Sequence, residues 1–230
     1  RTTQVGGLDV SYHSGRVDWA TVVDQGHAFA FTLSTAGVDF CDPLFTSHWA
    51  RMEGLHRGAY HFFVATDDPA LQARWFIANT PLGPGDLAPV VDVETAGDDP
   101  PDDLPARLRV FVMNLERHYG VKPVVYTGPA FWNRYLGAGF GEHALWVAEY
   151  GVDRPVVPRG WSGWTLWQHQ GNATIPGVER GVDLNPDSWL AHFNLGFHYF
   201  NTKRYAPALP YLKYAAEHTD TWWVPLHTYA

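Results

Sequence analysis

The sequence has one cysteine, no cluster of basic residues and no long apolar run. Cys41 has no second cysteine to pair with, so an internal disulfide and a multi-cysteine zinc site are excluded. The formal net charge is −8 and the 16 Lys and Arg residues are scattered, which argues against nucleic acid as a partner and against an electrostatic membrane anchor. No apolar segment approaches the roughly 20 residues of a membrane-spanning helix, so we expect no membrane span.

Several catalytic signatures are missing as well. The chain has no G-x-S-x-G, and none of its 12 His residues forms an H-E-x-x-H or another close pair on an expected helix. No Gly-rich phosphate loop follows the first apolar run. These absences argue against a serine hydrolase, a zinc protease and a nucleotide-binding enzyme, and we expect neither a metal nor a cofactor. His61 lies inside an expected strand, where we interpret it as a hydrogen-bonded core residue.

Apolar and aromatic residues are plentiful. Of the 230 residues, 46% are hydrophobic, which is enough for one sizeable core. Aromatic residues make up 15% of the chain and include 11 Trp. Large flat rings either line a cleft or fill a Trp-rich core, and the count alone fits both interpretations.

Short apolar runs alternate with longer segments of helical periodicity. We expect strands at 5–10, 28–34, 58–64, 87–94, 122–128, 144–150, 163–170 and 180–185. We expect helices at 17–26, 43–54, 67–80 and 102–120. Strands separated by helices indicate a parallel sheet, because parallel neighbours need long crossovers. The pattern predicts an α/β barrel of the (β/α)8 type whose last helices are reduced to loops, with an open doubly wound sheet as the alternative.

The last forty or so residues follow a different pattern. Within 188–219, the spacing of Leu-Gly, Tyr, Ala, Leu and Ala resembles a tetratricopeptide repeat. A single repeat cannot bury its own apolar face, so it must pack on the barrel, pair with another chain or continue into further repeats. An amphipathic helical hairpin that extends the barrel is the equal alternative. We therefore expect a barrel domain over 1–187 and a short α-helical extension over 188–230.

Two carboxylates lie one residue apart in the stretch PVVDVETAG. In a strand, Asp92 and Glu94 share a face, while Val91 and Val93 point the opposite way. Two nearby buried carboxylates disfavour each other's charge, so one of them is expected to stay protonated near neutral pH. A protonated acid beside an ionised carboxylate is the pair that glycoside hydrolysis requires. The simpler alternative is that both acids are solvated loop residues.

Two further acids are expected at the same end of the barrel. Asp9 ends the first strand and Asp183 lies in the last one. The first and last strands of a closed barrel are neighbours, so both acids are expected to face the same mouth as Asp92 and Glu94. Four acids at the ends of three strands form a specific signal for a catalytic cleft. A hard-cation site built from the same four acids is the competing interpretation.

Aromatic residues fall near the same strand ends. They are Tyr60, Phe62, Tyr126, Trp146, Tyr150 and Trp167. Rings at a cleft stack on sugar faces, whereas core packing is the alternative for each of them. We assign roles in the cleft first to Tyr126 and Tyr150, because their hydroxyl groups also supply hydrogen bonds.

The ordered motifs resemble one known family. GLDVS, VDW, GAYHFF, QARWFI, GDLAPVVDVE, GVKPVVYTG, LWVAEY, WTLWQH and GVDLN are similar, in this order, to the motifs of the glycoside hydrolase family 25 lysozymes. The resemblance runs from about Gly7 to Asn185. It implies an irregular TIM-like (β/α)5(β)3 barrel that hydrolyses the β-1,4 bond between N-acetylmuramic acid and N-acetylglucosamine of peptidoglycan, with retention.

The resemblance also implies residue roles. Glu94 would be the general acid/base, and Asp92 either the nucleophile or the residue that orients the substrate acetamido group. Asp9 and Asp183 would position the substrate and tune this pair. Gln168 of the WTLWQH motif joins the aromatic residues as an expected substrate contact. The chain departs from the family at LSTAG, where Leu33 and Ala36 replace charged residues of a KATEG-like run.

The expected partner is bacterial peptidoglycan, with residues 188–230 as a surface for a protein partner or self-association. The chain begins RTTQVGG, without Met and without an apolar signal core; either a leader has been removed or the chain is a piece of a longer one. We expect an extracellular or cell-wall location, or an endolysin in a host cytoplasm. A wall-binding scaffold that has lost activity and a hydrolase of chitin-type polymers are the alternative functions.

Overall fold

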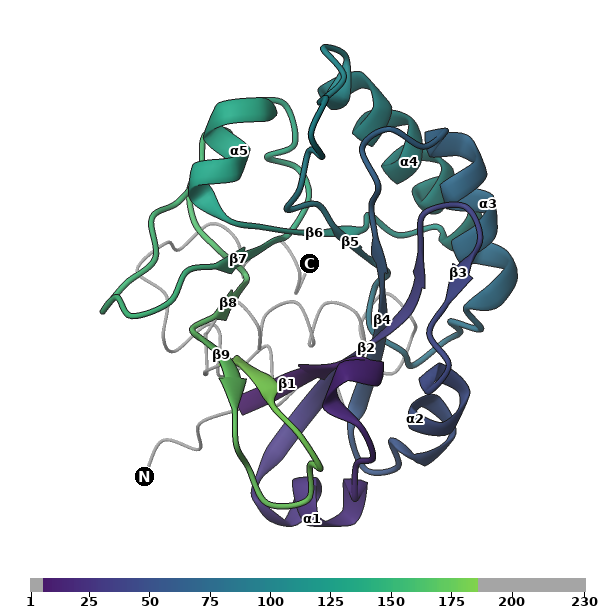
Figure 1. The fold of residues 1–230 in the computed structure, drawn as a ribbon, viewed down its shortest axis with the longest axis vertical. Coiled ribbons are helices and arrows are strands. Elements are labelled where there is room, and N and C mark those ends of the chain that lie inside the picture. Colours follow the sequence, from purple (N-terminus) through teal and green to yellow (C-terminus); the bar gives the residue numbers. More distant parts are fainter. Residues whose placement is uncertain (1–5, 186–230) are drawn as a thin grey trace, which may run out of the picture.

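The computed structural model describes residues 6–185, drawn in colour in Figure 1. The helical extension expected at 188–230, and its boundary at 187, lie outside the described residues. Among residues 6–185, no helix is both long enough and apolar enough to cross a membrane.

Strands and helices alternate over most of the described chain. The strands are β1 (Gly6–Val10), β2 (His27–Ala36), β3 (Phe40–Cys41), β4 (His56–Phe62), β5 (Val90–Asp92), β6 (Val124–Thr127), β7 (Leu145–Ala148), β8 (Leu166–Gln168), β9 (Gln170–Ala173) and β10 (Val182–Asn185). The helices are the 3₁₀ turn η1 (Tyr12–Ser14), α1 (Trp19–Asp24), α2 (Phe45–Arg51), α3 (Pro69–Asn79), α4 (Leu104–Tyr119) and α5 (Pro129–Tyr135).

The strands form one sheet that curls into a nearly closed barrel. Their order is β8-β7-β6-β5-β4-β2-β1-β10-β9, and all neighbours from β8 to β1 are parallel. The backbone N–H of His169, just after β8, donates to the carbonyl of Leu184 in β10 at 3.1 Å. This bond brings the two ends of the sheet together. Figure 1 shows the strands arranged in a ring, with α2, α3, α4 and α5 outside this ring.

Two apolar layers lie on the two sides of the sheet, and β5 shows how the sequence builds them. Val90 belongs to the cluster inside the barrel, whereas Val91 and Val93 belong to the larger cluster between the sheet and the helices. The inner cluster consists of Phe29, Phe31, Val90, Val124, Tyr126, Trp146 and Leu166. Side chains alternate along a strand, so Asp92 shares the inward direction of Val90.

Two glycines make room for the rings inside the barrel. A Cβ atom on Gly7 would lie 2.2 Å from the ring of Phe29, and one on Gly58 would lie 2.3 Å from the ring of Phe31. No real Cβ approaches another atom so closely. The glycines of GLDV and GAYHF are therefore required by close packing.

The helix signals of the sequence are confirmed where they were clearest. Asp68 accepts hydrogen bonds from the backbone N–H groups of Ala70 and Leu71, and so begins α3 as an N-cap. Leu104, Leu108, Phe111, Val112 and Leu115 form the buried face of α4 at the spacing of a helix, and Gly120, with φ of +72°, caps its end.

Several features differ from the prediction. The strand expected at 163–170 is only three residues long, as β8, and a further short strand, β9, follows it at Gln170–Ala173. The short elements η1 and β3 were not predicted, and β10 runs antiparallel to β1. Only a short loop joins β9 to β10, and a parallel pair would need a crossover of a dozen or more residues. Helix α5 was not predicted from the pattern, because its seven residues are too few to display a helical period.

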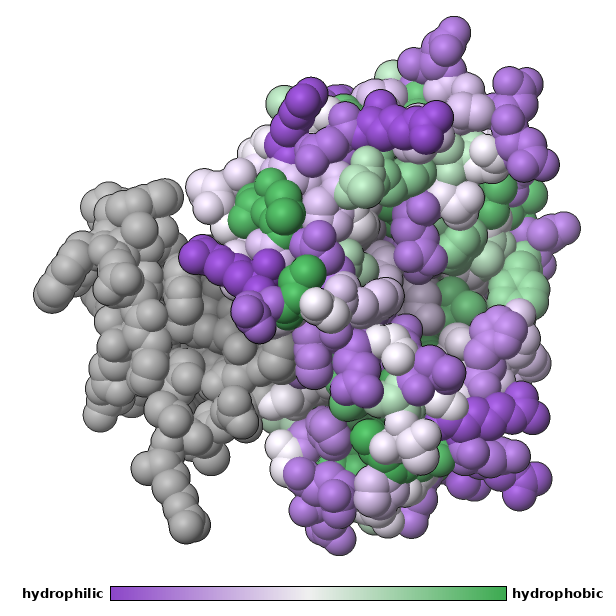
Figure 2. All heavy atoms as spheres, turned by 60° about the vertical axis from the view of Figure 1, so that its left-hand side comes forward, coloured by the Kyte–Doolittle hydropathy of each residue, from purple (hydrophilic) through white to green (hydrophobic). Residues whose placement is uncertain are grey.

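The exterior is mixed in polarity, and His61 is part of the packed interior. In the view of Figure 2, hydrophilic side chains cover much of the surface, with smaller hydrophobic patches between them. His61 is fully buried; its Nδ1 lies 2.8 Å from Oγ1 of Thr35 and its Nε2 lies 3.1 Å from Oε1 of Gln72. Burial lowers the pKa of His61 to about 4. The interpretation of His61 as a hydrogen-bonded core residue is confirmed.

Candidate active site

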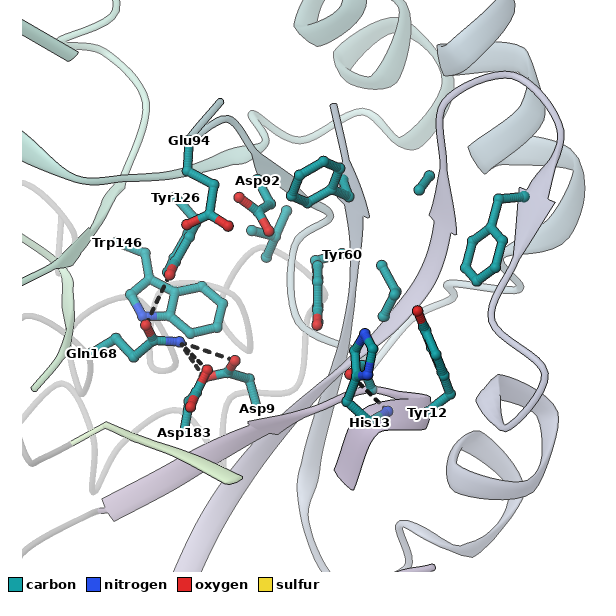
Figure 3. A pocket seen from close by; sticks show the side chains of 16 residues that line it. Asp9, Tyr12, His13, Tyr60, Asp92, Glu94, Tyr126, Trp146, Gln168 and Asp183 are labelled. Atoms are coloured by element: carbon teal, nitrogen blue, oxygen red, sulfur yellow. Dashed lines mark hydrogen bonds between the residues drawn. The ribbon is translucent and has the colours of Figure 1, made fainter. Parts of the chain in front are cut away.

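A cavity of about 510 Å³ opens at the carboxyl ends of the parallel strands, and its two sides differ in chemistry. The acidic wall consists of Asp9, Asp92, Glu94, Tyr126, Gln168 and Asp183. The apolar wall consists of Leu33, Ala36, Phe40 and Phe62. Figure 3 shows the carboxyl groups of the acidic wall facing one another across the cavity, with Tyr126 and Gln168 between them.

Strand β5 places Asp92 and Glu94 at different depths of the cavity. Asp92 is the last residue of the strand and is buried, with 7% of its surface exposed. Strand pairing continues for one more residue, since the N–H of Val93 donates to the carbonyl of Tyr126 at 3.0 Å. Glu94 therefore keeps the inward direction of Asp92, as predicted, but lies at the solvent-accessible mouth.

Asp92 and Glu94 differ in their hydrogen bonds. Oδ1 of Asp92 is buried and has no hydrogen-bond partner among residues 6–185. Burial, followed by the nearby charges of Glu94 and Asp9, holds the pKa of Asp92 well above its usual range. Burial also raises the pKa of Glu94, while a hydrogen bond with Tyr126 opposes that rise. Both directions agree with the prediction that one of these carboxyls stays protonated near neutral pH.

Asp9 and Asp183 are direct neighbours across the antiparallel pair of β1 and β10. The prediction that the first and last strands bring these acids together is confirmed by this register. Burial, and then the charge of Asp183, raise the pKa of Asp9 to about 8, although hydrogen bonds from Gln168 and Asn185 oppose the rise. Asp183 accepts a bond of 2.7 Å from the N–H of Asn172, and burial raises its pKa as well.

Two amides connect these acids to the rest of the wall. Nε2 of Gln168 lies 3.0 Å from both oxygens of Asp9 and 3.3 Å from Oδ2 of Asp183. Nδ2 of Asn185 donates to Oδ2 of Asp9 at 3.0 Å, while its Oδ1 accepts from Nε1 of Trp146 at 2.6 Å. Sequence reasoning missed Asn185. The same two-residue spacing that joins Asp92 to Glu94 also joins Asp183 to Asn185, and it was the available signal.

The predicted aromatic residues divide into two groups. Tyr60, Phe62, Tyr126 and Trp146 line the cavity. The Tyr60 hydroxyl donates to the carbonyl of Val10 at 3.4 Å, and burial together with the nearby carboxylates holds the Tyr60 pKa well above its usual range.

Tyr150 and Trp167 are not among the residues that line the cavity. Tyr150 is half exposed at the edge, and its hydroxyl donates to Oε1 of Gln168. In β8, Leu166 packs inside the barrel and Gln168 lines the cavity, so Trp167 faces the other side; its Nε1 donates to the carbonyl of Glu149 at 2.8 Å. Sugar binding by Trp167 stays a prediction without a cavity contact.

The side of the cavity away from the acids includes residues that sequence reasoning did not single out. The rings of Tyr12 and His13 lie 3.9 Å apart, and Tyr12 lies 5.8 Å from Phe40. Leu33 and Ala36, which replace charged residues of the family pattern, lie beside them in the apolar wall. Tyr12 lies in the 3₁₀ turn η1 and Phe40 in the two-residue strand β3, short elements without a motif, so only the fold could bring them together.

The described part of the chain offers no support for the competing metal interpretation. Within residues 6–185, no group of three or more His, Cys, Asp or Glu is arranged to hold a metal ion. The amide donors of Gln168 and Asn185 occupy the oxygens of Asp9 instead.

Comparison with known proteins agrees with this geometry. Residues 8–178 match the model of the glycosyl hydrolases family 25. The chain belongs to this family. It is therefore a glycoside hydrolase.

The family relatives include bacterial and fungal proteins. The chain is 35% identical over 186 residues to the uncharacterized protein YegX of Escherichia coli K12, covering 78% of this chain and 68% of that protein. It is 31% identical over 202 residues to lysozyme M1 of Streptomyces globisporus, covering 80% and 68%.

Solved structures show the same fold. The bacterial lysozyme of Streptomyces coelicolor superposes with a TM-score of 0.76 at 28% identity, covering 82% of this chain and 94% of that one. The family GH25 lysozyme of Aspergillus fumigatus gives a TM-score of 0.71 at 26% identity, with 80% and 94% covered.

Proposed function

We propose that this protein is a lysozyme that hydrolyses bacterial peptidoglycan at the β-1,4 bond between N-acetylmuramic acid and N-acetylglucosamine. The observation that carries the proposal is the acidic wall, in which Asp92 and Glu94 from one strand meet Asp9 and Asp183 from the joined ends of the sheet. The relatives named lysozyme M1 and bacterial lysozyme support the substrate class.

Glu94 is the proposed general acid/base. It lies at the solvent-accessible mouth, where a glycosidic oxygen has access, and burial by the walls raises its pKa toward neutral pH. In the first step its proton passes to the glycosidic oxygen, and the bond between that oxygen and the anomeric carbon breaks. In the second step Glu94 takes a proton from water, whose oxygen bonds to the anomeric carbon.

Asp92 is the proposed partner of Glu94 on the other side of the anomeric carbon. It either attacks that carbon directly or orients the substrate acetamido group, whose carbonyl oxygen then attacks. Each route forms an intermediate that water opens, and two displacements at one carbon give retention. Asp9 and Asp183 position the substrate and tune the charge of this pair, and Tyr60, Phe62, Tyr126 and Trp146 are the proposed sugar contacts.

We also infer that the barrel is of the (β/α)5(β)3 type. Each of β1, β2, β4, β5 and β6 is followed by a helix before the next parallel strand, whereas, among residues 6–185, no helix separates β7, β8 and β10 from one another. Because the proposed substrate is a wall polymer, the proposed place of action is the cell wall.

Digestion of purified peptidoglycan tests the proposal. The wild-type protein should release reducing ends, and mass spectrometry of reduced fragments should find N-acetylmuramic acid at the new end. Glu94→Gln is the matched control, because it keeps the shape of the side chain and removes the acid. Equal activity of the two proteins would overturn the role of Glu94, and wall binding without any turnover would favour a scaffold. Preference for chitin oligomers over muropeptides would favour the chitin-type alternative.

A further inference from the structure

The amide of Gln168 has no polar atom left for a substrate. This residue ends β8 and is buried, with 1% of its surface exposed. Its Nε2 donates to Asp9 and Asp183. Its Oε1 accepts from the hydroxyl of Tyr126 at 2.8 Å and from the hydroxyl of Tyr150. Gln168 thus connects protein groups on opposite sides of the acidic wall, which is a different task from the sugar contact expected of it.

The neighbours of Gln168 match the observed direction of its amide. An ionised carboxylate only accepts hydrogen bonds, whereas a tyrosine hydroxyl both donates and accepts. In the observed direction the amide nitrogen donates to Asp9 and Asp183, and the carbonyl oxygen accepts from Tyr126 and Tyr150. A reversed amide would lose these bonds whenever Asp9 and Asp183 are ionised, so the observed direction is the one that favours their charged forms.

Tyr126 has one hydroxyl proton and two acceptors for it. Its hydroxyl donates to Gln168, and it also makes a hydrogen bond with Glu94 that lowers the pKa of that acid. Figure 3 shows the Tyr126 hydroxyl between Glu94 and Gln168. When the proton points to Gln168, the contact with Glu94 can persist only if Glu94 supplies a proton of its own. Gln168 and ionised Glu94 therefore compete for the same proton.

We propose that Gln168 is a positioning residue: its carbonyl takes the proton of Tyr126, which leaves Glu94 to keep its own, while its amide group favours ionised Asp9 and Asp183. This inference rests on the proposed function, in which Glu94 is the general acid. After Glu94 gives its proton to the glycosidic oxygen, the Tyr126 hydroxyl turns to the new carboxylate. It turns back to Gln168 when Glu94 recovers a proton from water.

Tyr150 makes the proposal testable in both directions. Because Tyr150 donates to the same carbonyl oxygen, it weakens the hold of Gln168 on Tyr126. The ionisable groups that face Glu94 and Gln168 from the surrounding elements are Asp9, Tyr60, Asp92, Tyr126, Tyr150 and Asp183. Loss of the Gln168 donors would let Asp9 and Asp183 hold protons more readily, and this reduces the negative charge around Glu94. The charge effect therefore has the same sign as the hydrogen-bond effect.

The experiment measures the pKa of Glu94 by NMR in protein whose glutamate carboxyls are labelled with ¹³C, using Glu94→Gln to assign the signal. Gln168→Met should lower the pKa of Glu94 by about one unit, because the Tyr126 proton becomes free to bind the carboxylate. Tyr150→Phe should raise it, because Gln168 then holds Tyr126 alone. The alkaline limb of the kcat/KM profile should move in the same directions, which simple structural damage would not produce.

Opposite shifts in the two variants support the inference, whereas no shift in either, or shifts in the same direction, overturn it. A thermal melt first shows whether Gln168→Met is folded. If it is not, Tyr150→Phe decides alone, since this residue is half exposed: a rise supports the inference, and an unchanged or lowered pKa overturns it. The NMR reading needs no turnover, so an active Glu94→Gln would defeat the proposed function without deciding this result.

Discussion

The acidic and apolar walls line the same cavity, but they affect the protein in opposite ways. The acidic wall holds four carboxyl groups whose pKa values are all raised, chiefly by burial. The apolar wall consists of Leu33, Ala36, Phe40 and Phe62, which carry no charge, so lining the cavity does not cost these side chains the desolvation of an ionised group.

The fold separates the groups that carry out chemistry from the groups that bind the substrate. Buried acids cost stability, and the structure keeps them because the barrel places them at the ends of strands that are held by many other contacts. Apolar and aromatic side chains bind sugar faces without taking part in proton transfer. We therefore expect substitutions in the acidic wall to change kcat, and substitutions in the apolar wall to change KM.

The largest effect is expected for Glu94→Gln. Removal of a general acid costs about 10²–10⁴-fold in rate, and we expect a fall in kcat of about 10³-fold with little change in KM. Release of reducing sugar from peptidoglycan, with kcat and KM determined on a soluble fragment, checks this prediction. A rise in KM with an unchanged kcat would show that Glu94 binds the substrate and does not act as the general acid.

Asp92→Asn should separate activity from stability. Asp92 is buried, and its Oδ1 has no partner among residues 6–185, so a neutral amide removes the cost of confining this acid. We expect a loss of activity of about 10²-fold and a gain of about 1–3 kcal/mol in the free energy of unfolding. Urea unfolding at pH 7.5 measures the gain. Ser34→Ala, a buried substitution away from the acids, is the control for nonspecific effects; a destabilised Asp92→Asn would contradict the account.

Phe40→Ala tests the other wall. Phe40 is exposed at 38% and lies beside Tyr12 at the edge of the cavity, so its removal should not disturb the fold. Loss of one aromatic ring should weaken the binding free energy of the sugar by about 0.5–1.5 kcal/mol. This corresponds to a rise in KM of about 2–10-fold, with kcat unchanged. Leu71→Ala, at an exposed residue of α3 that does not line the cavity, should leave KM unaltered. A kcat of Phe40→Ala as low as that of Glu94→Gln would contradict the expectation that the apolar wall affects only KM.

The pH dependence of stability gives the smallest expected effect. In the unfolded chain Asp titrates near 3.9, whereas burial raises the folded pKa of Asp9 to about 8. The folded state therefore binds more protons in this window, and stability falls as pH rises from 7 to 8, by up to about 1.4 kcal/mol per retained proton. Histidines with lowered pKa values, such as His61, oppose this slope, but they act mainly between the folded value of about 4 and the unfolded value near 6.5, and their contribution fades between pH 7 and pH 8. Urea unfolding at both pH values measures how the free energy of unfolding changes with pH. Asp92→Asn should reduce this change, because one buried acid that retains a proton is removed. A free energy of unfolding that rises from pH 7 to 8 would contradict the raised pKa values of the acidic wall.

The features that could be predicted from the sequence are those set by the pattern of neighbouring residues. The alternation VVDVE placed Asp92 and Glu94 in the cavity, and the leucines of α4 placed its buried face, because strand and helix periods act over a few neighbouring residues. The closure of the sheet brought Asp9 and Asp183 together as expected.

Other features depend on contacts between distant segments. The direction of β10, the bonds of Gln168 to Asp9, and the meeting of Tyr12 with Phe40 join residues that no local period relates. Gln168 shows the limit most clearly. Its motif marked it as important, but only its partners distinguish a sugar contact from a residue that positions the acids.

The central claim is that the acidic wall carries out two successive displacements at one anomeric carbon. Proton NMR of the first products from a soluble peptidoglycan fragment, recorded before the anomers interconvert, tests it most directly. With two displacements, the β-anomer of the new reducing sugar appears first and then equilibrates with the α-anomer. Initial appearance of the α-anomer would show a single displacement by water and would contradict the roles proposed for Asp92 and Glu94.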